Sequence, residues 1–144
     1  MVVANHLLIT GPSRGGKSEW AEQRIRELGA SAAITYLATG PTLPDDAAWQ
    51  RRLNRHRHRR PDHWRLLEAS SLSAVSKLLM QGSDCHDDLV LLDSLGGLVA
   101  SGLELDEDCW LELQATFLMA LANRPPPVVL VAEEVGWGVV PPTA

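Results

Sequence analysis

The sequence predicts an α/β fold in which helices cover both faces of a mostly parallel sheet. Two observations predict this fold. Short apolar runs, typical of buried strands, alternate along the chain with segments whose apolar residues recur at helical spacing. A glycine-rich loop also follows the first apolar run and leads directly into a helical segment. The expected strands are residues 7–9, 32–38, 87–94 and 128–132, with a shorter one at 64–68.

The composition is typical of one globular domain spanning residues 1–144. Apolar residues make up 45% of the chain, enough for a sizeable core at this length. The formal net charge of −5 argues against nonspecific nucleic-acid binding, so no nucleic-acid partner is expected. No apolar run approaches the roughly 20 residues of a membrane span, and residues 1–6 do not resemble a signal peptide. The expected location is the cytoplasm.

The glycine-rich loop fits the phosphate-binding pattern G-x-x-x-x-G-K-[ST] and is preceded by a strand and followed by a helix. This context predicts a P-loop NTPase with a RecA-like sheet. Backbone N–H groups of the loop and the positive end of the helix would bind phosphate oxygens. Lys17 would reach the β- and γ-phosphates, and Ser18 would hold Mg²⁺. The nucleotide-binding residues expected from the loop are Gly11, Pro12, Ser13, Arg14, Gly15, Gly16, Lys17 and Ser18.

Helical segments are expected after each strand. The first follows the P-loop to residue 28, and a second begins at Pro44, Asp45 and Asp46, where proline and aspartate favour a helix start. Others are expected at residues 73–80, from residue 95, and from residue 106 to about 121. The second strand ends at Thr39 and Gly40, and ligands of open α/β sheets bind at this end of the strands. These two residues either face the nucleotide or form an ordinary turn.

The second unusual stretch is strongly basic. Six of the 13 lysines and arginines lie in residues 51–61, within an acidic protein. Three interpretations are open: a solvated helix end, a nucleic-acid patch, or an anion site in which arginines bind phosphates. The P-loop favours the anion site, because it already predicts a triphosphate nearby.

A third signal is the apolar run that ends in Asp93. A buried strand ending in a carboxylate is the Walker B pattern, whose acid holds Mg²⁺ directly or through water. Many strands end in aspartate at a turn, so the pattern alone is weak. Paired with a P-loop about eighty residues upstream, it predicts a nucleotide or metal role for Asp93.

The chain resembles the bifunctional adenosylcobinamide kinase/adenosylcobinamide-phosphate guanylyltransferase family of cobalamin biosynthesis. The resemblance covers essentially the whole chain. It rests on the P-loop and Asp93, together with Tyr36-Leu37-Ala38-Thr39, Arg52-Leu53-x-x-His56-Arg57-x-x-Arg60-Pro61-x-x-Trp64 and Glu134-Val135-Gly136-Trp137-Gly138-Val139-Val140-Pro141. The last two motifs are specific to that family.

The resemblance implies two reactions. One transfers a γ-phosphate from ATP or GTP to adenosylcobinamide, and the other transfers GMP from GTP to adenosylcobinamide phosphate through a histidine–GMP intermediate. It further implies Mg²⁺, a corrinoid substrate and a homotrimer. The histidine that carries GMP corresponds to His56, and the other positions that match the family's nucleotide site are Arg57, His58, Arg59, Arg60, Glu68 and Asp93.

The chemistry of histidine agrees with this role. Neutral imidazole has a lone pair that can attack phosphorus, and neighbouring arginines would keep His56 unprotonated. His58 and His63 are its rivals, whereas His6 and His86 are expected at the surface. Two other functions stay open: a P-loop kinase or NTPase without a covalent step, and a nonenzymatic nucleotide- or nucleic-acid-binding module.

The end of the chain differs from the family pattern. Family members continue with an arginine-rich helix and a final strand, whereas this chain ends at Ala144. We therefore expect a chain whose C-terminal part is missing, with the P-loop site formed. The strand at residues 128–131 or its neighbour would then be an exposed sheet edge.

Overall fold

The predicted fold class is confirmed by a five-stranded, wholly parallel sheet within the described residues. The computed structural model describes residues 5–12, 14–29, 31–40 and 45–134. The strand order is β1-β5-β4-β2-β3, and every neighbouring pair is parallel. The strands are β1 (Leu7–Gly11), β2 (Ile34–Ala38), β3 (Arg65–Glu68), β4 (Leu89–Asp93) and β5 (Val128–Glu133).

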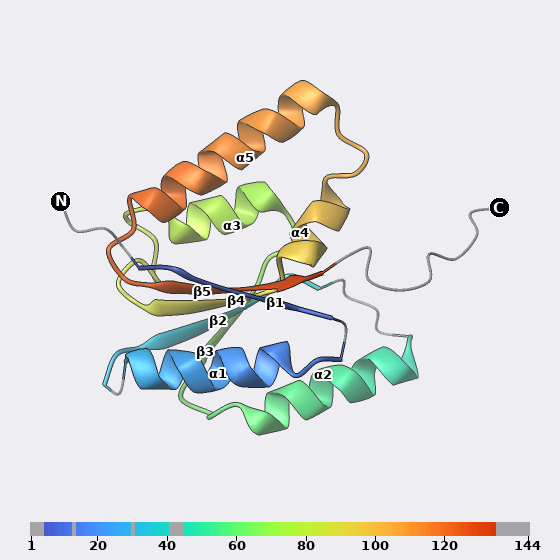
Figure 1. Cartoon of the computed structure of the whole chain (residues 1–144), viewed down its shortest axis with the longest axis vertical. Coiled ribbons are helices and arrows are strands. Elements are labelled where there is room, and N and C mark those ends of the chain that lie inside the picture. The colour runs from blue at the N-terminus through green and yellow to red at the C-terminus, as the bar shows by residue number, and fades with distance from the viewer. Residues whose placement is uncertain (1–4, 13, 30, 41–44, 135–144) are drawn as a thin grey trace.

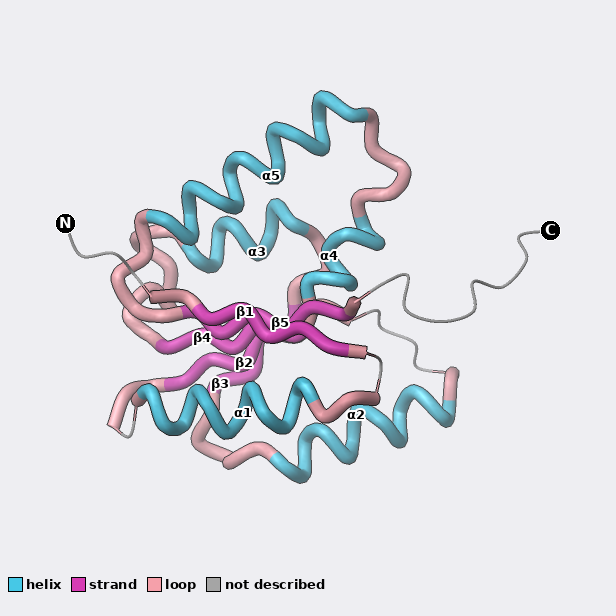
Figure 2. Tube along the Cα trace, viewed as in Figure 1, coloured by secondary structure: helices cyan, strands magenta, loops and turns pink. Residues whose placement is uncertain are grey.

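Helices cover both faces of this sheet, as the sequence predicts. In Figures 1 and 2, α1 and α2 lie below the sheet, and α3, α4 and α5 lie above it. Two of the helices begin at aspartate caps: the Asp46 carboxylate accepts the Trp49 N–H, and the Asp106 carboxylate accepts the Cys109 N–H. The helices are α1 (Lys17–Leu28), α2 (Ala47–Arg59), α3 (Leu72–Leu79), α4 (Leu95–Ser101) and α5 (Glu107–Ala122).

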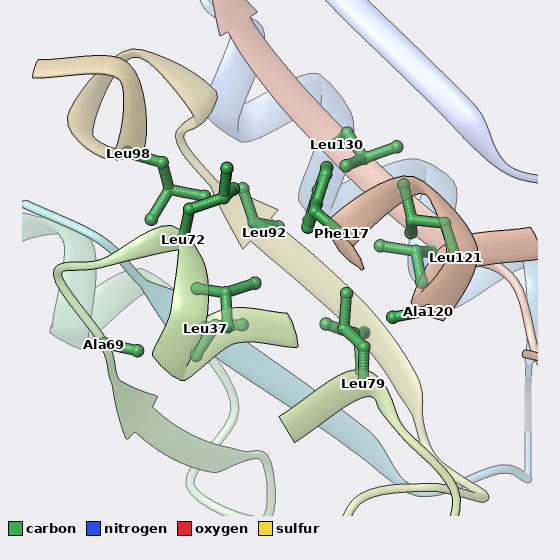
Figure 3. Packing of buried hydrophobic residues seen from close by; sticks show 13 residues of the cluster. Leu37, Ala69, Leu72, Leu79, Leu92, Leu98, Phe117, Ala120, Leu121 and Leu130 are labelled. Atoms are coloured by element: carbon green, nitrogen blue, oxygen red, sulfur yellow. The ribbon is translucent and has the colours of Figure 1, made fainter. Parts of the chain in front are cut away.

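The apolar core lies in two layers, one on each face of the sheet. Strand β4 is continuously apolar because both of its faces are buried. Val90 and Leu92 pack on one face of the sheet, whereas Leu89 and Leu91 pack on the other. Figure 3 shows the layer beneath α3, α4 and α5, where Leu92 lies among side chains from all three helices. The opposite layer packs the sheet against α1.

The strand register brings the functional ends of the strands together. Gly11 at the end of β1 pairs with Glu133 at the end of β5, and Ala38 pairs with Asp93. Because all five strands are parallel, the P-loop and Asp93 lie at the same edge of the sheet. Strand β5 separates the strands that carry them.

Among the strands of the described residues, the two at the sheet borders are β3 and β1. The strand expected at the border, β5, pairs with β1 on one side and β4 on the other, so its neighbour β1 is the border strand. The Leu8 side chain of β1 is correspondingly 56% exposed. None of the helices described is long and apolar enough to cross a membrane.

His6 and His86, both expected at the surface, are each half-buried, so this expectation is wrong for both. His6 does not lie free at the surface but is half-buried between β5 and α5. Its Nδ1 accepts the Val128 N–H at 3.0 Å, and its Nε2 lies 2.7 Å from the Leu121 carbonyl oxygen. Local sequence patterns could not indicate these partners of His6, because they lie more than 100 residues away along the chain.

Candidate active site

The P-loop forms a tight turn that needs two of its glycines. Gly15 donates its N–H to the Pro12 carbonyl oxygen at 3.1 Å, and a Cβ on Gly15 would lie 2.9 Å from that oxygen. Gly16 has φ of 76°, in the left-handed region that favours glycine. It is the N-cap of α1 and no side chain caps that helix among the described residues, so the first N–H groups of α1 are suited to an anion.

Two P-loop side chains point to phosphate chemistry. Lys17 is half-buried and donates its Nζ to the Pro12 carbonyl oxygen at 2.6 Å, which keeps its ammonium group next to the loop. Ser18 follows in the first turn of α1, and the side chains of Lys17 and Ser18 line one cleft. Ser13, also predicted to bind nucleotide, lies outside the described residues.

The P-loop forms one wall of a cleft of about 920 Å³, and α2 forms another. Cationic side chains from both walls line it, in a protein whose net charge is negative. Such a cleft suits a polyphosphate, because arginine and lysine pair with phosphate oxygens. Its lining residues are Arg14, Gly15, Gly16, Lys17, Ser18, Glu19, Asp46, Ala48, Trp49, Arg52, Arg55, His56, Arg59, Asp93, Val131 and Glu133.

The two faces of α2 differ. Arg52, Arg55, His56 and Arg59 follow helical spacing and line the cleft. His58 does not: its side chain is exposed, and its Nδ1 lies 2.7 Å from the Asn54 carbonyl oxygen of its own helix.

Arg57 and Arg60, both predicted to bind nucleotide, line a separate pocket of about 110 Å³. Its other walls include Tyr36 and Trp64. The Arg60 guanidinium lies 3.7 Å from the centre of the Tyr36 ring, and its Nε donates to the His56 carbonyl oxygen at 3.0 Å. The structure therefore does not bring Arg57 and Arg60 into the P-loop cleft with Arg59.

Arg59 joins α2 to α1. Its Nε and one terminal nitrogen donate to the two oxygens of Glu22 at 2.9 and 3.1 Å, and its other terminal nitrogen donates to Glu19 at 2.6 Å. The terminal nitrogen of Arg59 that donates to Glu22 also lies 3.1 Å from His56 Nδ1. Glu22 is buried, whereas Glu19 is exposed. The hydrogen bond to Glu22 raises the pKa of Arg59, so the guanidinium stays charged.

His56 lies in an environment that favours its neutral form. Burial lowers its pKa below the ordinary 6.5, and the neighbouring Arg59 lowers it further. Asp93 and Glu22 act in the opposite direction but more weakly than burial and Arg59. A neutral imidazole carries the lone pair that a nucleophile needs.

Asp93 lies at the end of β4 and lines the cleft. Its Oδ2 accepts a hydrogen bond from the Tyr36 hydroxyl at 2.6 Å. Burial raises the pKa of Tyr36 far above its ordinary value, and the Asp93 carboxylate raises it further, so the hydroxyl remains a donor. Tyr36 thus fixes one oxygen of Asp93, and no hydrogen bond from the described part of the chain occupies the other, which leaves it for a ligand.

The remaining predicted residues lie around this core. The Thr39 hydroxyl is buried; it donates to the Ser94 carbonyl oxygen at 2.5 Å and accepts the Ser94 N–H at 2.8 Å. Gly40 lies against the Trp49 ring, with space for no larger residue unless the ring shifts. Glu68 is exposed at the end of the border strand β3 and is not among the residues that line the cleft.

Sequence reasoning did not assign half of the cleft residues to the site, and three of these are Arg52, Arg55 and Glu133. Arg52 lies four residues before His56 and Arg55 lies four before Arg59, so helical spacing was the signal that could have found them. Glu133 ends the strand next to the P-loop strand and accepts a hydrogen bond from the Ser94 hydroxyl at 2.7 Å. A carboxylate at a strand end was the signal for this residue, as it was for Asp93.

The parallel sheet, the glycine loop before α1 and the carboxylate at the end of β4 define a P-loop nucleotide-binding protein. Comparison with protein families identifies the family within this class. Residues 7–144 match the family model described as cobinamide kinase / cobinamide phosphate guanyltransferase. The chain belongs to this family, whose members are transferase enzymes of cobalamin biosynthesis.

Curated relatives agree with the family. The chain is 34% identical to the bifunctional adenosylcobalamin biosynthesis protein CobU of Escherichia coli K12, over 94% of this chain and 78% of the relative. The Salmonella typhimurium LT2 protein of the same name gives the same three values. The bifunctional adenosylcobalamin biosynthesis protein CobP of Pseudomonas aeruginosa PAO1 is 35% identical, over 93% of this chain and 74% of the relative.

Proposed function

We propose that this chain phosphorylates adenosylcobinamide with ATP or GTP and then transfers GMP from GTP to the resulting phosphate through a His56–GMP intermediate. The observation that carries the proposal is that His56 and the P-loop line the same cleft. A single nucleotide bound in that cleft would therefore lie near both the P-loop and His56. The family and its named relatives support the same pair of reactions.

In the phosphorylation step, the protein's work is binding and charge stabilisation. The N–H groups at the start of α1 and the Lys17 ammonium would bind the β- and γ-phosphates, where negative charge develops during transfer. Arg14, Arg52 and Arg55, which also line the cleft, would balance the rest of the triphosphate charge. The hydroxyl of the corrinoid would then attack the γ-phosphorus in line with the leaving nucleotide.

In the guanylylation step, an imidazole nitrogen of His56 forms a bond to the α-phosphorus of GTP. The bond from that phosphorus to the bridging oxygen breaks, and its electron pair leaves with pyrophosphate. The phosphate of the corrinoid then attacks the same phosphorus and releases the imidazole. The lowered pKa of His56 supports this role, because it leaves the ring neutral before attack.

The residues of the cleft also fit Mg²⁺. Within the described residues, no group of three or more histidine, cysteine or acidic side chains could hold a metal by itself. Mg²⁺ at phosphate sites instead binds one or two protein oxygens together with the substrate phosphates. The Ser18 hydroxyl and the free oxygen of Asp93 provide such oxygens. When bound, the ion would neutralise charge on the phosphates.

The proposal is tested by incubating the protein with GTP labelled at the α-phosphate. We expect label on the protein that is acid-labile and alkali-stable, as a phosphoramidate is, and that moves to adenosylcobinamide phosphate when this is added. Parallel incubation with γ-labelled nucleotide and adenosylcobinamide should label the corrinoid. Phosphorylation of the corrinoid without any label on the protein would instead favour a P-loop kinase with no covalent step.

We also propose that copies of the chain form a homotrimer. The α5 helix supports assembly, since Leu111, Leu118 and Met119 are all exposed on it. Light scattering on the purified protein measures the molar mass directly. A mass of one chain across the micromolar range would contradict the proposal.

A further inference from the structure

Arg59 connects His56 to a buried carboxylate of the P-loop helix. Glu22 is 2% exposed and accepts two hydrogen bonds from Arg59, a bidentate geometry that fixes the plane of the guanidinium. A terminal nitrogen of the same guanidinium lies 3.1 Å from His56 Nδ1. Arg59 is thus not a free cation awaiting phosphate: Glu22, Glu19 and His56 occupy it.

This contact determines the state of the imidazole. Guanidinium has donors but no acceptor, so a hydrogen bond between Arg59 and Nδ1 requires a lone pair on Nδ1. In the neutral ring, the proton must then lie on Nε2. A protonated Nε2 has no lone pair, which leaves Nδ1 as the ring's nucleophilic atom.

We propose that Glu22 and Arg59 position His56 so that Nδ1 is the atom that attacks the α-phosphorus of GTP. This inference rests on the proposed guanylyl transfer through His56 and adds the attacking atom and a positioning residue, Glu22. Arg59 acts on the reacting nitrogen itself, whereas Glu22 acts through Arg59.

The attack is balanced with the groups already in the site. The Nδ1 lone pair becomes the bond to phosphorus, and the electron pair of the broken bond leaves with pyrophosphate. Nε2 keeps its proton during attack, and the ring becomes cationic. As phosphorus approaches, the Arg59 N–H must leave the Nδ1 lone pair, and it would then be free to donate to a nonbridging oxygen of the newly attached phosphate. It can therefore bind the charge that develops there while Glu22 still holds the guanidinium.

Two conservative variants test the positioning. Arg59→Lys keeps the charge but loses the bidentate geometry, and Glu22→Gln keeps the size but loses the charge. We expect each to lower the rate constant of self-guanylylation at saturating GTP by roughly 10- to 100-fold, the scale of a misplaced reacting group. The KM for GTP should change by less than about threefold, because the loss lies after binding.

Matched controls lie on the same two helices. Arg51 of α2 does not line the cleft, and Glu27 of α1 pairs with Arg24 on the exposed surface. Arg51→Lys and Glu27→Gln should leave guanylylation unchanged. Corrinoid phosphorylation and the melting temperature show whether the test variants fold. A guanylylation rate that falls only in proportion to phosphorylation would overturn the positioning role.

The closing experiment identifies the attacking nitrogen. Protein labelled with ¹⁵N-histidine is incubated with GTP and Mg²⁺, without corrinoid, and held at alkaline pH. A ¹H–¹⁵N correlation spectrum with ³¹P coupling distinguishes the two ring nitrogens, because Nε2 couples to both ring carbon-bound protons and Nδ1 strongly to one. We expect phosphorus on Nδ1 of His56. Phosphorus on Nε2 of His56 overturns the inference but leaves the proposed function standing, whereas no histidine adduct overturns both.

Discussion

The two walls of the cleft bind a nucleotide in different ways. The P-loop wall offers backbone N–H groups, whose direction is fixed by the tight turn at Gly15 and the left-handed Gly16. The α2 wall offers side chains, and only those on one face of the helix line the cleft. A contiguous loop can be read directly from a sequence, but a basic helix cannot be interpreted until its cleft-facing side is known.

The largest expected effect separates two histidines of the α2 wall. His56→Ala should abolish labelling of the protein by α-labelled GTP while corrinoid phosphorylation continues, because the nucleophile serves only the covalent step. His58→Ala is the matched control, since His58 is exposed and bonded within its own helix. Loss of labelling in His58→Ala but not in His56→Ala would show that the nucleophile lies on the other face of α2.

The P-loop wall should show the next largest effect. Lys17→Ala removes an ammonium group whose one hydrogen bond within the described residues is to the Pro12 carbonyl oxygen, so the fold should persist. Phosphoryl transfer should fall by about 10³-fold, the scale of losing a group that stabilises transition-state charge. Steady-state phosphorylation of adenosylcobinamide and a thermal melt measure the two expectations. A folded Lys17→Ala protein with normal turnover would show that the loop is not catalytic.

The arginines of α2 should show a smaller, graded effect. Arg52→Ala removes a cation that lines the cleft, whereas Arg51→Ala removes one that does not. We expect the dissociation constant for GTP to rise roughly tenfold in the first, about 1.4 kcal/mol, and to stay unchanged in the second. Titration calorimetry measures both. Equal weakening by the two variants would mean that net charge, and not the helix face, governs binding.

The smallest expected effect concerns pH. Because burial and Arg59 lower the pKa of His56 below 6.5, the ring stays neutral to lower pH than an ordinary histidine. The guanylylation rate should hold as pH falls to 6.5 and decline only as pH falls through the lowered pKa. The groups that set this value are Arg52 and Arg59 of α2, Glu22 of α1 and Asp93 of β4. The measurement is single-turnover labelling from pH 5 to 8.

Phosphorylation of the corrinoid over the same pH range is the control, because it shares the ionisation of the nucleotide but does not use His56. An acidic limb of guanylylation centred above pH 6.5 and absent from phosphorylation would contradict the lowered pKa.

The fold was largely predictable because its signals are local. Each strand is a short apolar run, and the aspartates that begin α2 and α5 are caps that a sequence displays. The site was predictable only in part. Tyr36 bonds Asp93 across 57 residues of sequence and Arg59 bonds Glu22 across 37. Neither pairing produces a periodic pattern that a sequence would display. Sequence reasoning therefore grouped Arg57, Arg59 and Arg60 as phosphate ligands, although the helix directs them to different surroundings.

The central claim is that one face of α2 carries the covalent chemistry in the cleft that it shares with the P-loop. Its most direct test is to map the GMP adduct by tandem mass spectrometry, after cleavage at neutral pH with a protease that does not cut at arginine. The account predicts that the adduct lies on His56 and disappears in a variant of that residue alone. An adduct on His58, or on any residue outside the cleft-facing side of α2, would contradict it.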